Sequence, residues 1–122
     1  MEVKGTKELL RKLNSISSKA VGVKIIKNAV AKGCHTVQGA AKLLCPVDTG
    51  ELRNSIVTKV EEKSDRVIGK VYTNKEYAPY VELGTTSQSA QPYMYPALKD
   101  NEEEVKNQIA EEIAKEIRKM VE

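Results

Sequence analysis

The triplet Asp48-Thr49-Gly50 has the residue types that aspartic proteases place at their catalytic centre, and it lies within the stretch CPVDTGELRNSI at 45–56. In those enzymes two carboxylates share one proton. A chain of 122 residues would therefore have to form a homodimer, with one Asp from each copy. The stretch raises the question of whether Asp48 is a catalyst or begins a helix.

The residues on both sides of the triplet favour the second answer. No apolar strand leads into it, and Glu51-Leu52-Arg53 are good helix formers. The charged turn at 62–65 does not have the composition of a protease flap. We expect Asp48 or Thr49 to cap a short helical turn by accepting a hydrogen bond from a free backbone N–H. A homodimeric aspartic protease acting through Asp48 is the least favoured function.

Other catalytic or metal sites find less support. His35 is the single histidine and is adjacent to Cys34, and neighbouring helical residues point about 100° apart, so they do not converge on one metal ion. The sequence has no Gly-rich phosphate loop and no Ser-His-acid set. We expect no enzyme activity, no metal and no cofactor.

Apolar periodicity predicts three helices. A short helix follows Thr6 and ends near Ile16, and a long one covers about 18–44, with Gly33 and Gly39 inside it. A glycine there costs about 1 kcal/mol relative to Ala, which hints at close packing. A long amphipathic helix is expected to have Pro96 in its first turn. The apolar residues of the long helix are Val23, Ile26, Val30, Cys34, Val37, Ala41 and Leu44, and those of the last helix are Val105, Ile109, Ile113, Ile117 and Met120.

Between these helices the pattern changes to that of strands. Residues 55–74 alternate β-branched and polar side chains around the turn at 62–65, which predicts an antiparallel hairpin with one buried face. Residues 84–92, GTTSQSAQP, have no period and predict a mobile loop. The expected fold is α+β, with N-terminal helices and a long C-terminal helix packed on a small antiparallel sheet. We expect one domain over 1–122.

Charge is unevenly distributed along the chain. The net charges of residues 1–46, 47–99 and 100–122 are +7, 0 and −4. Opposite signs predict that the acidic C-terminal helix lies near the basic helices, in its own chain or in a neighbouring one. Cys34 and Cys45 are too far apart in a helix to form a disulfide, so we expect reduced thiols. No apolar run is long enough to cross a bilayer, and we expect neither a membrane partner nor secretion.

Three segments together resemble a known phage family. They are PVDTGELRNSI, then YAPYVELGT at 77–85, then QPYMYPAL at 91–98 before a charged C-terminal helix. Their order and spacing are similar to those of the family named after gene product ten of phage Hong Kong 97. The members of this family are head-tail joining or tail-completion proteins of long-tailed phages and prophages.

The resemblance implies a non-enzymatic structural protein that assembles into a homo-oligomeric ring, for which six subunits is one candidate size. Its location would be the neck or the upper end of the tail in the virion, after assembly in the bacterial cytoplasm. Its partners would be connector, neck and tail proteins. No specific nucleic acid is implied, although the genome can pass through such a ring. Aromatic residues near proline suit interfaces, so the candidate interface residues are Tyr77, Pro79, Tyr80, Glu82, Tyr93, Met94 and Tyr95.

A small basic nucleic-acid-binding module is the alternative function. It would use the lysines of the N-terminal helices. These lysines are spread out, and no aromatic residues are interleaved with them for base stacking. We therefore favour the structural protein over this module.

Overall fold

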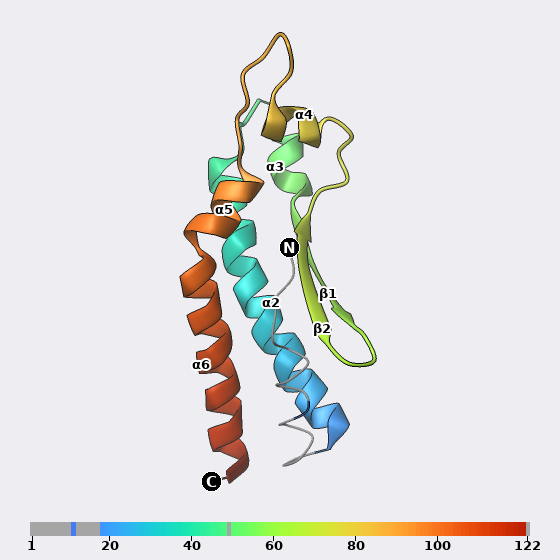
Figure 1. Cartoon of the computed structure of the whole chain (residues 1–122), viewed down its shortest axis with the longest axis vertical. Helices are drawn as coiled ribbons and strands as arrows, with labels where there is room; N and C mark the ends of the chain where they lie inside the picture. The colour runs from blue at the N-terminus through green and yellow to red at the C-terminus, as the bar shows by residue number, and fades with distance from the viewer. Residues whose placement is uncertain (1–10, 12–17, 49, 122) are drawn as a thin grey trace.

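The computed structural model describes residues 11, 18–48 and 50–121. In chain order the elements are α2 (Lys19–Leu44), α3 (Glu51–Ser55), β1 (Val57–Glu62), β2 (Val67–Tyr72), α4 (Ala78–Leu83), α5 (Met94–Asp100) and α6 (Glu102–Val121). Figure 1 shows an elongated molecule in which α2 and α6 run side by side along the longest axis and the hairpin lies on the other side of α2. The predicted α+β class is confirmed. The helix expected to follow Thr6 falls almost entirely outside the described residues.

Helix α2 is the central element and contacts α3, α5, α6 and both strands. It begins after Ser18, whose side chain accepts a hydrogen bond from the N–H of Val21 at 3.3 Å, and it ends at Cys45, where Pro46 follows and the backbone is extended. The predicted apolar series is buried through Ala41, but Leu44 is 48% exposed. The buried face continues from Ala41 to Cys45 instead, so the prediction for Leu44 was wrong.

The hairpin packs one face against α2. Strands β1 and β2 pair antiparallel, with Val60 opposite Gly69 and Thr58 opposite Val71. A Cβ on Gly69 would lie 2.5 Å from Cγ1 of Val30 and would also collide with the Sγ of Cys34. Only a glycine therefore allows β2 to approach α2 this closely. On the same face the hydroxyl of Thr58 donates to Oε1 of Gln38 at 2.6 Å.

The other face of the hairpin carries a charge cluster. Lys59 lies directly opposite Lys70, an unfavourable pair of like charges. The Glu61 carboxylate offsets it, at 3.3 Å from the Lys59 ammonium and 3.1 Å from that of Lys70, and Lys63 is 3.5 Å away. Hydrogen bonds from Lys70 and Lys59 lower the pKa of Glu61 to about 2.

Helix α6 packs against the opposite side of α2 with Val105, Ile109 and Ile113 buried. A Cβ on Gly33 would lie 2.9 Å from Cγ1 of Val105, so this glycine permits the close packing that the sequence suggested. The Lys32 ammonium lies 3.3 Å from the Glu112 carboxylate. The predicted proximity of acidic and basic helices is confirmed, and it occurs within one chain.

The last helix differs from its prediction, because it is interrupted. Helix α5 ends at Asp100 and α6 begins at Glu102, with Asn101 between them outside helical geometry. The Asn101 amide donates to the carbonyl oxygen of Ala97 at 2.8 Å and so satisfies an acceptor at the end of α5. Three glutamates then occupy the first turn of α6, where the helix dipole favours negative charge.

Candidate functional site

The segment APYVEL at 78–83 forms the short helix α4, with Tyr77 at its N-cap position. Pro79 stands at the start of the helix and Gly84 at its end, which is the usual placement of these two residues. Tyr80 is 65% and Leu83 77% exposed, whereas Ala78 is buried. The helix therefore presents apolar side chains to solvent on one face and packs on the core with the other.

Glu82 has a role that the sequence did not reveal. Its Oε1 accepts hydrogen bonds from the N–H groups of Tyr93 at 3.2 Å and Met94 at 2.9 Å, and its Oε2 accepts one from Tyr95 at 3.3 Å. These are the free amides at the first turn of α5. The residue at the N-cap position, Tyr93, makes no side-chain capping hydrogen bond. The carboxylate thus joins α4 to α5 across the loop between them.

Replacing this carboxylate tests the connection. We expect Glu82→Ala to lower the free energy of unfolding by about 2 kcal/mol, because three amides lose a charged acceptor. Glu82→Gln keeps the shape and one acceptor oxygen, so its loss should be smaller. Thermal unfolding of the two variants and of the exposed control Glu76→Gln checks this order; equal stability of Glu82→Ala and the wild type would contradict it.

Tyr93 is part of the core and not of the surface. It is 1% exposed, and burial, with the nearby acidic groups of Cys45 and Glu82, raises the pKa of its hydroxyl to about 12. Its aromatic ring is therefore covered within the chain, and we withdraw Tyr93 from the candidate interface. Met94 is half-buried and Tyr95 is 67% exposed, so the YMY group is divided between core and surface.

The loop between α4 and α5 projects beyond the helices as a finger at the top of Figure 1. Every residue from Thr85 to Pro92 is exposed. Its base is closed by a bond from the N–H of Gln91 to the carbonyl oxygen of Val81 at 2.8 Å. Gly84 has a φ of 79°, and a Cβ there would lie 2.7 Å from the N of Ala90. The mobility expected for this loop stays a prediction.

The end of α2 adds apolar surface that the periodicity did not predict. Leu43 is 89% and Val47 57% exposed. Cys45, between them, is buried and belongs to the same core cluster as Ala78 of α4 and Ala97 of α5. We call this region the end surface; its large apolar members are Leu43, Leu44, Val47, Tyr77, Tyr80, Leu83 and Tyr95.

The Asp48-Thr49-Gly50 triplet precedes α3. Gly50 stands at the N-cap position with a φ of 85° and no side chain to cap the helix. Asp48 is exposed, and Thr49 lies outside the described residues. Capping by Asp48 or Thr49 therefore stays a prediction.

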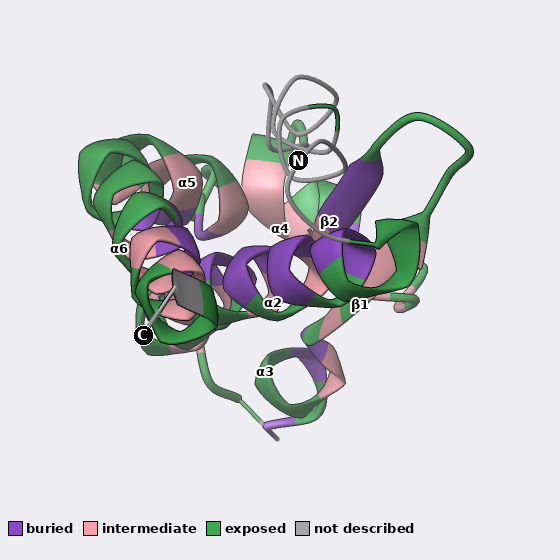
Figure 2. Ribbon diagram, turned by 90° about the horizontal axis from the view of Figure 1, so that it is seen from below, coloured by how far each residue is buried: buried purple, intermediate pink, exposed green. Residues whose placement is uncertain are grey.

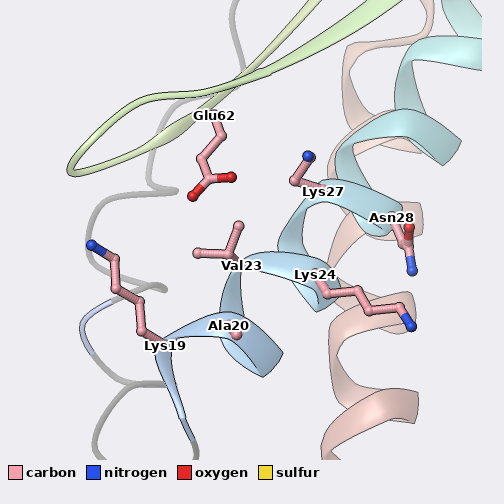
Figure 3. Close-up of a pocket in the computed structure, with 7 residues that line it drawn as sticks. All are labelled: Lys19, Ala20, Val23, Lys24, Lys27, Asn28 and Glu62. Carbon is pink, nitrogen blue, oxygen red and sulfur yellow. The ribbon is translucent and has the colours of Figure 1, made fainter.

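An open groove lies at the other end of α2, lined by Lys19, Ala20, Val23, Lys24, Lys27, Asn28 and Glu62. Figure 3 shows the Glu62 carboxylate between the ammonium groups of Lys19 and Lys27, with Lys24 and Asn28 pointing away. Lys19, Lys24 and Glu62 are exposed. The groove is therefore an open surface feature lined mainly by exposed charged groups and is not an enclosed pocket.

Residues 7–84 match the family model described as "Bacteriophage HK97-gp10, putative tail-component". The chain belongs to this HK97 gp10-like family. No curated protein and no solved structure matched the chain. The match contains α2, α3, the hairpin and α4, so the QPYMYPAL part of the resemblance lies beyond it.

Membership of the HK97 gp10-like family favours a structural role over the catalytic and metal-binding candidates. A phage tail component is a virion protein, and the family description names no catalytic activity. Across the described ranges no three His, Cys, Asp or Glu side chains are grouped so that they could hold a metal ion. Among the helices in those ranges, none is long and apolar enough to cross a membrane.

Proposed function

We propose that this HK97 gp10-like chain is a non-enzymatic structural subunit that forms a homo-oligomeric ring at the head-tail neck or the upper end of the tail. The family match supports a structural protein of the tail. The end surface carries the finer part of the proposal, because it gathers apolar side chains from α2, α4 and α5 at one end of an elongated molecule.

Such a surface is typical of a contact with another protein. Tyr80 and Leu83 extend from the same short helix, and Leu43 lies at the end of a helix whose other apolar residues are mostly buried. Large exposed apolar side chains gathered in one region of a small protein are typical of an interaction site, and tyrosine is enriched in the cores of interfaces. We assign the end surface to the contact with the adjacent connector or tail protein.

A variant of the end surface tests the assignment. Tyr80→Ser combined with Leu83→Ser should leave thermal unfolding nearly unchanged, because both side chains are already in water. The same variant should fail to complement a phage or prophage whose copy of the gene has been deleted, leaving DNA-filled heads and unattached tails. Met120→Ser, an exposed apolar residue at the far end of α6, is the matched control and should complement. Normal particle yield from the double variant would contradict the assignment.

The basic part of α2 supports a second candidate, a nucleic-acid-binding module. Helix α2 carries five lysines and no acidic residue. Such a module would bind duplex DNA with an affinity that falls steeply as salt rises. The test is retention on a DNA column. If the wild type and the control Lys99→Glu are retained, and the double variant Lys19→Glu with Lys24→Glu is not, this candidate is favoured over the structural protein.

A further inference from the structure

Among the described residues, no close contact requires a glycine at position 39. Gly39 lies on the exposed face of α2, and a Cβ added there would meet no atom within 4 Å. A glycine within a helix is unfavourable relative to alanine. At Gly33, six residues earlier, this cost is offset by the close packing of Val105 and Ile109 that the glycine permits. No packing contact in the described part of the chain offsets the cost of the glycine at position 39.

The residues around Gly39 form a distinct surface. His35 and Leu43 are one helical turn away on each side and Lys42 is three residues away, so they share its face. Leu43 is 89% exposed. Of the five lysines on α2, Lys32 is the one that forms an ion pair within the described residues. The face is thus small at its centre, carries the positive charge of Lys42 and borders the end surface at Leu43.

Helix α6 has a surface of complementary character. Opposite its buried stripe, the exposed residues Glu103, Asn107, Ala110 and Glu111 share one face. Ala110 is small, and the two glutamates form no ion pair within the described ranges. Figure 2 shows the exposed faces of α2 and α6 on different sides of the molecule.

We propose that the face of α2 around Gly39 packs against the face of α6 around Ala110 in a second copy of this chain. The inference rests on the proposed function and names the contact between neighbouring subunits. Small residues at the crossing allow two helix backbones to approach closely, while Lys42 and His35 lie near the partner's glutamates. Because the two faces are on different sides, one molecule can make both contacts at once, as a head-to-tail ring requires. Binding of DNA phosphate by flexible lysines would not require a glycine between them.

Substitution of Gly39 separates folding from assembly. Gly39→Gln places a side chain in open space within the monomer, so its melting temperature should equal or exceed that of the wild type. Its self-association should weaken by about tenfold or more, the effect of overpacking a close contact. Sedimentation at low salt and millimolar chain concentration measures this. Ser64→Gln, in the exposed hairpin turn, is the control and should associate like the wild type.

Charge reversal identifies the partner face. Glu103→Lys with Glu111→Lys should weaken association, and adding Lys42→Glu to the same chain should restore part of it. If the wild type and Gly39→Gln associate equally well, the proposed contact between α2 and α6 is wrong, whereas the proposal of a ring is unaffected. A wild type that stays monomeric under these conditions also overturns the contact, and the ring is then judged from assembled particles. Loss of DNA binding in Lys42→Glu with unchanged association would assign the α2 face to nucleic acid and refute the contact.

Discussion

Tyr93→Ala is expected to lower the free energy of unfolding by about 3 kcal/mol or more, the usual effect of removing a buried aromatic side chain. Tyr93 is 1% exposed and packs where the end of α2 meets α4 and α5. A domain of this size is stable by only about 5–15 kcal/mol, so the variant should unfold at a clearly lower temperature or denaturant concentration.

Tyr95→Ala is the matched control, two residues away on the same segment and 67% exposed. Its effect on stability should be within about 0.5 kcal/mol, as for most surface changes. Urea unfolding followed by circular dichroism measures both variants. If the two substitutions destabilise the chain equally, the division of the YMY group between core and surface is incorrect.

Gly69→Ala is expected to destabilise the fold by about 1–3 kcal/mol through overpacking. The new methyl group would collide with Cys34 and Val30 of α2, and valine is stiff in a helix, so relief requires the hairpin to move away. The comparison is Gly39→Ala, where nothing lies within 4 Å. That substitution should stabilise the chain by about 1 kcal/mol, because alanine is the better helix former.

Thermal unfolding of both alanine variants shows directly whether each substitution raises or lowers the stability of the chain. Opposite signs are expected from a glycine that faces α2 and a glycine that faces solvent. A Gly69→Ala chain as stable as the wild type would show that β2 does not pack directly on Val30 and Cys34 of α2.

Local patterns in the sequence were sufficient for the long elements. The apolar period of α2, the stop before Pro46 and the alternation in the hairpin each follow from side chains within one element. The break at Asn101 was missed because the apolar and charged pattern continues through it, and only the bond from Asn101 to Ala97 marks the end of α5.

The candidate site was harder to predict, because its residues are brought together by tertiary contacts. Tyr93 and Tyr95 are alike in sequence, and burial of the first depends on where α2 ends. Glu82 appeared as a surface charge, since its partners are backbone amides more than ten residues away. Leu43 lies outside the apolar series predicted for the buried face of α2 and is exposed, but no pattern in the sequence placed it beside α4 and α5.

A reconstruction by electron microscopy of the phage particle that encodes this chain tests the central claim most directly. We expect a closed ring of copies of this chain at the neck or the upper end of the tail, with the end surface against the adjacent connector or tail protein. Particles in which the chain is absent from that region, or present there as isolated copies that do not contact one another, would contradict it.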